Sequence, residues 1–235
     1  MRVLGIDASA QTGGAALIED GRLAGQTVAD MERRHAERLT PALDALMRLV
    51  GWTPKSLDLV CVSAGPGSFT GVRIGMSCAK ALAYACGLPL VCVPSLDAAA
   101  HRYRYARRPV CVLFDARKNE VYEAHYRPSA VGCELERVGP MRCRSIEETV
   151  RSVQTETLFV GSGAETYGAQ IRSALGELAC FNSGATDWIS PADVASVGEL
   201  AYSQNPKAYR DIHAAAPIYI RKPEAELSAQ KRDAS

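Results

Sequence analysis

A glycine-rich loop is the segment of this sequence whose composition best suits ligand binding. Residues 65–71, Gly-Pro-Gly-Ser-Phe-Thr-Gly, follow an apolar run and precede a helical pattern, so backbone N–H groups and the positive end of the helix could hold an anion. No Lys-Ser or Lys-Thr pair follows the last glycine, which excludes a Walker A loop. A tight strand-to-helix turn is the alternative. The candidate anion-binding residues are Asp7, Ser9, Gly65, Gly67, Ser68, Thr70 and Gly71.

Acidic residues at strand ends raise the question of a metal-bound phosphate. Asp7 and Asp115 each end an apolar run, but Ala116 and Arg117 follow the second aspartate, where a phosphate-binding hairpin needs glycine. His35 has no second histidine four residues further on, so a helical pair of imidazole ligands is absent. We therefore expect neither a catalytic residue nor a metal site. The eight cysteines form no Cys-x-x-Cys pair, and those within apolar runs are expected to be buried hydrophobic residues.

Positive charge is concentrated in residues 101–108. This stretch holds four arginines and two tyrosines, the mixture of cations and rings that contacts nucleic acid. The end of a helix and a connector between domains is the alternative interpretation. The candidate nucleic-acid contacts are Arg102, Arg104, Arg107 and Arg108.

The composition restricts how this chain could serve a nucleic acid. Lys and Arg number 27 and Asp and Glu 26, so a net charge of +1 gives no global field for holding a polyanion without a partner. No apolar run reaches the roughly 20 residues of a bilayer helix. Residues 1–7 do not resemble a signal peptide, because an acid interrupts the apolar run, and we expect a cytoplasmic protein.

The order of apolar runs and helical patterns is repeated along the chain. In the first half, strands are expected at 2–8, 14–18, 23–29, 57–63 and 88–93, and helices at 35–50, at 72–86 and from 96. The second half repeats this order, with strands at 109–114, 121–126, 134–141 and 158–160 and helices at 146–153 and 165–175. The two aspartates are offset by about 108 residues, which predicts two copies of one α/β unit with a cleft between them.

These patterns define the expected domains. We expect a first lobe over residues 1–105 and a second lobe over 106–221, with a helix at 191–204 that could pack back on the first lobe. Residues 222–235 are polar and are expected to form a disordered tail.

The helix at 72–86 has more apolar surface than one sheet can cover. Its only charged residues are Arg73 and Lys80, and small apolar residues occupy most of its other positions. With the amphipathic helix at 35–50, it could form half of a helical bundle with a partner; the alternative is that both helices fill the intramolecular core. The candidate partner or dimer contacts are His35, Glu37, Leu39, Leu43, Leu46, Arg73, Met76, Ala79, Lys80 and Ala83.

Four segments resemble the signature segments of the bacterial TsaB family, formerly called YeaZ. They are residues 3–9 (Val-Leu-Gly-Ile-Asp-Ala-Ser), 35–41 (His-Ala-Glu-Arg-Leu-Thr-Pro), the extended glycine loop 65–75 and 115–122 (Asp-Ala-Arg-Lys-Asn-Glu-Val-Tyr). The resemblance covers most of the chain. It implies an α/β, duplicated actin/Hsp70-like fold of two βββαβα units forming a cleft.

The resemblance also implies a role in making N6-threonylcarbamoyladenosine beside the tRNA anticodon. It implies a non-catalytic scaffold that pairs through its first two helices with a catalytic paralogue, TsaD. An ATPase, TsaE, is expected to join this complex, and the complex is expected to bind tRNA. Without these partners, the chain is expected to form a homodimer. ATP and metal are expected in the partners, and no cofactor in this chain. Residues 95–99 read Ser-Leu-Asp-Ala-Ala where the paralogue has a His-x-Glu-Gly-His metal motif. A nucleotide hydrolase using Asp7, or a glycoprotease, is the alternative.

Overall fold

The first lobe is built on a five-stranded sheet whose central strands are almost entirely buried. In this computed structural model, which describes residues 1–31, 34–129, 134–182 and 188–221, the strand order is β3-β2-β1-β4-β5. The strands β1, β2 and β3 are antiparallel, and β4 and β5 run parallel to β1. Their bounds are β1 (Arg2–Asp7), β2 (Thr12–Glu19), β3 (Arg22–Asp30), β4 (Leu59–Ser63) and β5 (Leu90–Val93).

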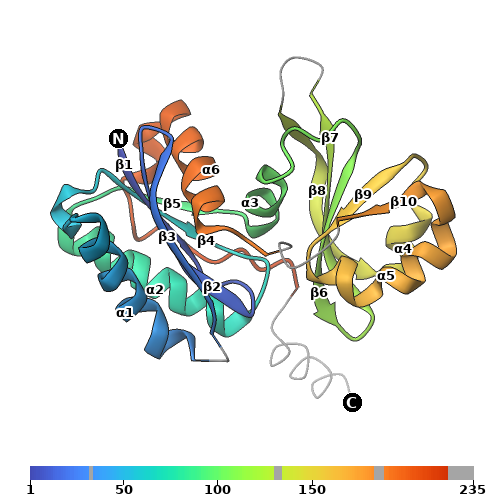
Figure 1. The fold of residues 1–235 in the computed structure, drawn as a ribbon, viewed down its shortest axis with the longest axis horizontal. Helices are drawn as coiled ribbons and strands as arrows, with labels where there is room; N and C mark the ends of the chain where they lie inside the picture. Colours follow the sequence, from blue (N-terminus) through green and yellow to red (C-terminus); the bar gives the residue numbers. More distant parts are fainter. Residues whose placement is uncertain (32–33, 130–133, 183–187, 222–235) are drawn as a thin grey trace.

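Helices cover both faces of this sheet (Figure 1). On one face lie α1 (His35–Val50) and α2 (Phe69–Cys86), and on the other lies α6 (Pro191–Gln204). The approach of α6 to the sheet depends on two glycines: a Cβ on Gly5 would lie 2.1 Å from the Pro191 carbonyl oxygen, and one on Gly198 would lie 2.3 Å from Cys61 Sγ. The helix at 191–204 therefore packs on the first lobe although it follows the second in sequence.

The second lobe repeats the same sheet. Its strand order is β10-β9-β6-β7-β8, which matches the first sheet strand for strand, with β6 in the place of β1. The strands are β6 (Val110–Arg117), β7 (Glu120–Pro128), β8 (Leu135–Ser145), β9 (Thr157–Val160) and β10 (Ala179–Phe181), and the helices are α4 (Ile146–Arg151) and α5 (Ser162–Leu175). The predicted duplication is confirmed.

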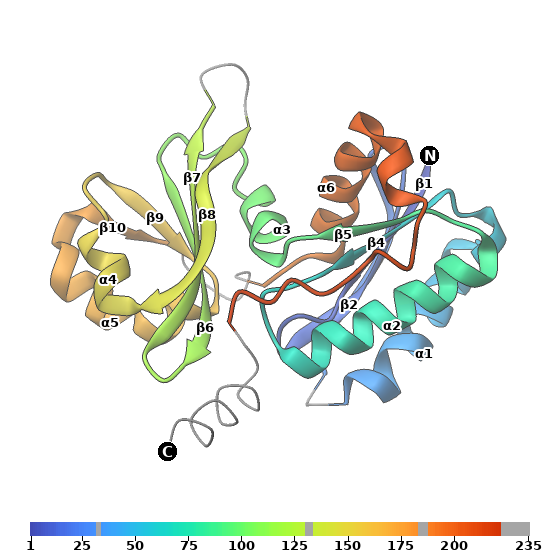
Figure 2. The same cartoon turned by 180° about the vertical axis from the view of Figure 1, so that it is seen from behind.

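The helix α3 (Ser95–His101) lies between the two lobes (Figure 2). Ala98 packs with the core between α6 and the first sheet, whereas Leu96 and Ala100 pack against the second sheet. Asp97 accepts hydrogen bonds from Tyr126 Oη at 2.7 Å and from Arg137 Nη1 at 2.9 Å, both in the second lobe. α3 therefore connects the two lobes mainly by apolar packing, and Asp97 adds polar contacts with the second lobe.

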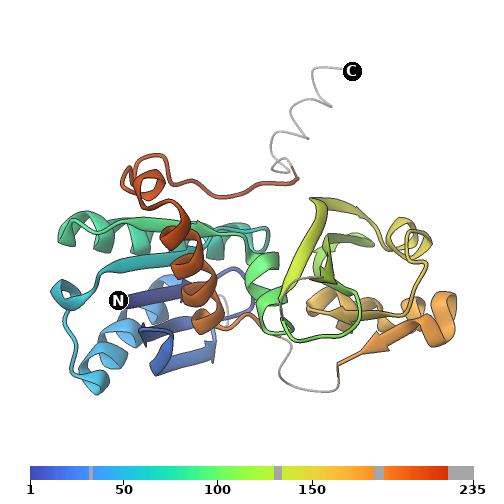
Figure 3. The same cartoon turned by 90° about the horizontal axis from the view of Figure 1, so that it is seen from above.

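The chain then returns across the first lobe as an extended segment. Residues 210–221, which follow the 3₁₀ turn η3 (Pro206–Tyr209), form what we call the C-terminal strap (Figure 3). Two further 3₁₀ turns, η1 (Pro54–Ser56) and η2 (Gly176–Leu178), lie elsewhere in the chain. Ile212, Ala215 and Ile218 pack against the core that α1 and α2 share with the sheet. The sequence contained this apolar run but did not indicate where it packs. The expected tail at 222–235 lies outside the described residues.

Most elements lie where the periodicity predicts them, and the differences have local causes. α2 begins three residues earlier than expected because Ser68 Oγ accepts a hydrogen bond from Gly71 N at 3.2 Å, so Ser68 acts as the N-cap. α5 begins at Ser162, three residues earlier than expected, because Gly161, with a φ of 94°, is its N-cap and directly follows β9. The strand β10 was not predicted: it has only three residues, all half-buried. Among the described residues, no helix has both the length and the apolar character to cross a membrane.

Candidate functional site

A cleft of about 1420 Å³ separates the two lobes. On the first lobe it is lined by the turn after β1 and by the start of α2, and on the second by the β6–β7 hairpin and α5. Of the candidate anion-binding residues, Ser9, Gly67, Ser68 and Thr70 line the cleft, whereas Asp7, Gly65 and Gly71 do not.

The glycine loop is packed tightly on the turn that follows β1. A Cβ on Gly67 would lie 2.3 Å from the Ser9 carbonyl oxygen, and one on Gly71 would lie 2.0 Å from the Ala8 carbonyl oxygen. Ser68 N donates a hydrogen bond to the same Ser9 oxygen at 2.7 Å. Contact between two backbone segments therefore accounts for both glycines without a ligand, which favours the turn interpretation. Ser68 and Thr70 remain exposed on the cleft side.

Asp7 does not reach the cleft, and this corrects its placement in an anion site. Its side chain is completely buried, and Oδ1 accepts hydrogen bonds from Ser9 N at 3.1 Å, Ser9 Oγ at 2.7 Å and Ser63 Oγ at 2.5 Å. Burial raises the pKa of this carboxyl, and the hydrogen bonds from Ser63 and Ser9 oppose that rise. Asp7 ties the end of β1 to the end of β4, which is a structural role.

Asp115 is the only one of the two strand-end aspartates that faces the cleft. Its Oδ1 accepts hydrogen bonds from Arg117 N at 2.8 Å and from Tyr167 Oη at 3.1 Å. The hairpin it begins is unusual, since Arg117, Lys118 and Asn119 all have φ between 55° and 62°. The two aspartates therefore have different surroundings and do not form a shared cation site. Within the described part of the chain, no group of three or more His, Cys, Asp or Glu side chains could hold a metal ion.

Most of the predicted interface residues on α1 and α2 belong to the core, which corrects that prediction. His35 is buried against the Ala10 carbonyl oxygen, 3.0 Å from its Nε2. The other buried candidates pack with the sheet in one core: Leu39, Leu43, Leu46, Met76, Ala79 and Ala83. The prediction misjudged how many elements surround α2, because α1, the sheet and the strap all pack against it. Of the other candidates, Glu37 is exposed and Lys80 is half-buried. The alternative, in which these side chains fill the intramolecular core, holds for the buried set.

Arg73 is exposed but already engaged. Its guanidinium carbon lies 3.7 Å from the centre of the Phe69 ring, and its Nε donates a hydrogen bond to Tyr219 Oη at 2.8 Å. The Phe69 and Tyr219 rings are 5.4 Å apart. Arg73 therefore holds the C-terminal strap against the start of α2.

A different surface of the two helices faces outward, and we call it the outer helical face. Leu49 of α1 is 83% exposed and Tyr84 of α2 is 74% exposed, although large apolar side chains normally pack. Small exposed residues lie along the same helices. The face consists of Pro41, Ala45 and Leu49 on α1 and Ser77, Ala81, Tyr84 and Ala85 on α2. Sequence periodicity could have found this set as the positions opposite the apolar stripe.

The basic stretch forms the connector between α3 and β6. Arg102 stacks on Trp188 at 4.8 Å from the ring centre, and Arg104 Nη1 donates a hydrogen bond to the His101 carbonyl oxygen at 3.1 Å. Arg108 forms an ion pair with Glu156, and Arg107 is exposed. Part of the positive charge is therefore used within the chain. Close by, His101 Nδ1 lies 2.8 Å from Asp193 Oδ1, so this histidine is paired with α6.

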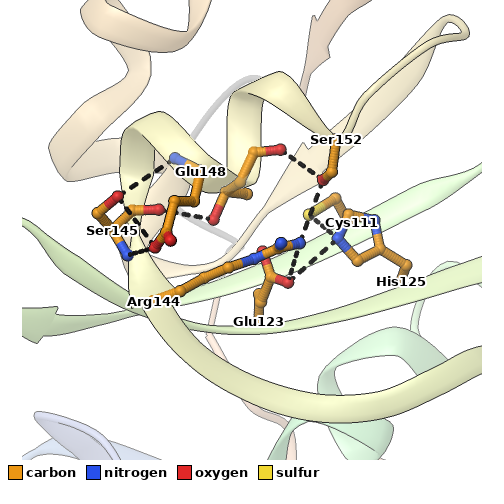
Figure 4. A network of polar contacts seen from close by, with 8 residues as sticks. Cys111, Glu123, His125, Arg144, Ser145, Glu148 and Ser152 are labelled. Carbon is orange, nitrogen blue, oxygen red and sulfur yellow. Dashed lines mark hydrogen bonds and ion pairs between the residues drawn. The ribbon is translucent and has the colours of Figure 1, made fainter.

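A buried polar network in the second lobe was not foreseen from the sequence (Figure 4). Glu123 is 1% exposed and pairs with Arg144 Nη2 at 2.5 Å and with His125 Nε2 at 3.5 Å. Burial alone would raise the pKa of Glu123, but hydrogen bonds from His125, Arg144 and Thr149 outweigh it and lower that pKa to about 2. The sequence did contain a signal for this network, because Glu123 and His125 occupy alternate positions of one strand among apolar residues.

The same network contains a cysteine, a histidine and a glutamate, and its geometry does not suit nucleophilic catalysis. Cys111 Sγ and Glu123 Oε1 both approach Nε2 of His125, at 3.9 Å and 3.5 Å, so the glutamate does not orient the ring through its other nitrogen. Cys111 is completely buried, which raises the pKa of its thiol well above the usual value. Cys61 is likewise buried, as predicted for the strand cysteines, and Cys92 is half-buried.

Comparisons with known proteins place the chain in a family. The family model described as "TsaD: tRNA N6-adenosine threonylcarbamoyltransferase" matches residues 27–229. The Bacillus subtilis protein named tRNA threonylcarbamoyladenosine biosynthesis protein TsaB is 30% identical over 229 residues, which cover 96% of each chain. The structure of YeaZ from Pseudomonas aeruginosa superposes with a TM-score of 0.78 at 25% identity, covering 93% of this chain and 99% of that one.

A more distant structure supports the fold alone. The ethanolamine utilization protein EutJ from Carboxydothermus hydrogenoformans has a TM-score of 0.53 at 10% identity, and the match covers 83% of this chain and 89% of that one. The predicted duplicated actin/Hsp70-like fold is confirmed. By its sequence and its fold, the chain belongs to the TsaB (YeaZ) family of proteins of tRNA threonylcarbamoyladenosine biosynthesis.

Proposed function

We propose that this chain is a non-catalytic subunit that binds the catalytic paralogue TsaD through its outer helical face and supports tRNA modification by that partner. The observation that carries the proposal is the exposure of Leu49 and Tyr84 on two adjacent helices beside small residues. Small side chains let the backbone of a second helix pair approach closely, and large apolar side chains fill pockets in a partner.

The polar groups described above support a non-catalytic role. Asp7 is enclosed by Ser9 and Ser63, and the cysteine of the buried network has a raised pKa, so neither is available as a nucleophile or base. The alternatives, a nucleotide hydrolase that uses Asp7 or a glycoprotease, therefore gain no support from the geometry of these residues.

The proposal extends to the remaining partners and to the compartment. Because the net charge is +1 and several arginines of the 101–108 connector are engaged within the chain, we assign tRNA binding to the complex rather than to this subunit. Arg107 is the connector residue best placed to add charge to such a complex. We also propose that TsaE joins the complex, that the outer helical face forms a homodimer when TsaD is absent, and that the protein acts in the cytoplasm.

A single substitution on the outer helical face tests the proposal. Ala81 is exposed on α2, so Ala81→Glu leaves the core unchanged and places an unpaired charge in the proposed interface. We expect the Kd for purified TsaD to rise by a factor of about 30 or more, as for a central contact, and the modification of tRNA in a reconstituted reaction to fall in parallel.

Ala174→Glu is the matched control. Ala174 is exposed on α5 of the second lobe, so the same charge is added to a helix far from the outer helical face. Thermal unfolding of both variants checks that they fold like the wild type. If Ala81→Glu folds normally and binds TsaD as tightly as Ala174→Glu does, the interface is elsewhere. Turnover of ATP or of a peptide by the isolated chain would contradict the non-catalytic role.

A further inference from the structure

The two lobes are joined on one side by packing that does not open easily. α3 is buried between the first sheet with α6 and the second sheet, through Leu96, Ala98 and Ala100. Separating these surfaces would expose apolar side chains to water, which opposes opening at this joint. Motion of the lobes about α3 would instead change the width of the cleft.

On a second route, the C-terminal strap crosses from the first lobe to the second (Figure 2). Ile218 N donates a hydrogen bond to the Ala64 carbonyl oxygen at 2.7 Å, and Tyr219 Oη accepts one from Arg73 Nε. Two residues further on, Arg221 Nη1 lies 2.9 Å from Glu120 Oε2 and 3.4 Å from the Ala116 carbonyl oxygen, both in the second lobe. The strap is thus anchored on one lobe by its backbone and by Tyr219, and on the other by one guanidinium.

The contacts on the two lobes differ in kind. Those on the first lobe include apolar packing by Ile212, Ala215 and Ile218. The contact with the second lobe is an ion pair between side chains that retain 23% and 37% exposure, although Oε2 of Glu120 is itself enclosed, so water reaches the two charges once the side chains separate. Glu120 and Ala116 belong to the β6–β7 hairpin region, whose neighbouring residues line the cleft.

We infer that residues 218–221 form a tie that fixes the opening of the cleft, with Arg221 and Glu120 as its releasable end. When the ion pair is closed, the β6–β7 hairpin is held at a fixed distance from the start of α2. When it is open, the lobes rotate about α3 and the cleft samples wider states. This role does not depend on the proposed interface with TsaD.

Distances between spin labels across the cleft test the tie. Thr70 on α2 and Thr166 on α5 are exposed on opposite walls, and genetically encoded ketone residues at these positions can be labelled without altering the eight cysteines. We expect one narrow distance distribution in the wild type. Arg221→Gln should raise the population of wider states by about fivefold, which corresponds to about 1 kcal/mol. Glu120→Gln should also raise this population, by no more than Arg221→Gln does, because Arg221 keeps its contact with the Ala116 carbonyl oxygen. The double variant should match Arg221→Gln, because that change already removes the ion pair.

Arg210→Gln is the control, since it removes the same charge from an exposed residue of the strap. We expect it to leave the distribution unchanged. Distributions that stay as narrow in Arg221→Gln and Glu120→Gln as in the wild type would overturn the inference. Equal broadening in Arg210→Gln would also overturn it, because the effect would then follow from the loss of charge rather than from the tie.

Discussion

The buried pair of Glu123 and Arg144 predicts a large loss of stability when its negative charge is removed. Glu123→Gln keeps the size and shape of the side chain, so packing is preserved while Arg144 loses its counter-ion. A pKa that falls from 4.5 in the unfolded chain to about 2 in the folded protein corresponds to about 3 kcal/mol of stabilisation at neutral pH. Breaking a buried pair by removing one partner typically costs 3–5 kcal/mol, which agrees with this value.

The loss has a defined pH dependence. Because folding lowers the pKa of Glu123, its contribution is complete above about pH 5 and disappears as the pH falls toward about 2. The difference in the free energy of unfolding between wild type and Glu123→Gln should therefore shrink from about 3 kcal/mol at pH 7 to near zero at the acid end.

Urea unfolding followed by circular dichroism measures this difference, and hydrogen exchange in β6 and β7 locates it in the second lobe. Glu136→Gln is the matched control, since Glu136 also pairs with an arginine, Arg127, but lies on the exposed edge strand β8, and it should cost less than about 1 kcal/mol. Replacing the pair together, as Glu123→Leu with Arg144→Met, should recover most of the loss. If Glu123→Gln costs no more than Glu136→Gln, the network does not stabilise the fold as argued.

Three further substitutions distinguish structural residues from exposed ones. Met76→Glu places a charge in the core beneath α2 and should abolish cooperative unfolding of the first lobe in a thermal scan. Ser77→Glu changes the next residue, which is exposed, and should not have this effect. Equal melting temperatures of the two variants would show that Met76 is not in the core. Gly71→Ala should destabilise the protein by about 3 kcal/mol in urea unfolding, because the new methyl group clashes with the Ala8 carbonyl oxygen. Gly87→Ala should cost only about 1 kcal/mol, because the space around Gly87 is open and only its φ of 66° is unfavourable. A larger loss for Gly87→Ala than for Gly71→Ala would disprove the close contact. Asp7→Ala should lower the midpoint of urea unfolding, because Ser9 and Ser63 lose their hydrogen-bond acceptor. The affinity of the folded variant for TsaD, measured by titration, should stay unchanged. An unchanged midpoint together with a lost affinity would show that Asp7 has a functional role.

The fold was predictable from the sequence to a greater extent than the site. The bounds of α1 and α6 coincide with the predicted ranges. α1 has a clear apolar stripe and ends at Gly51 in the left-handed conformation, and α6 begins with Pro191 after its N-cap Ser190. The interface residues were misassigned because the apolar surface of a helix does not reveal how many neighbours cover it. The core that contains Met76 and Ala79 is also packed by a strap more than 130 residues away. Asp7 was misplaced for a related reason, since the strand end that it occupies is closed by Ser63 from another strand.

The position of α6 affects the order in which the chain can fold during synthesis. Ser190 Oγ, at the start of α6, donates a hydrogen bond to Gln26, 164 residues earlier, and Val194 and Ala195 complete a core with Val3 and Leu59. The first lobe therefore has one sheet face uncovered until the ribosome has made residue 204, whereas all the strands of the second lobe lie within residues 110–181. The second lobe can therefore complete its fold before the first lobe does. Aggregation is most favoured while the N-terminal sheet of the nascent chain still lacks α6 on one face.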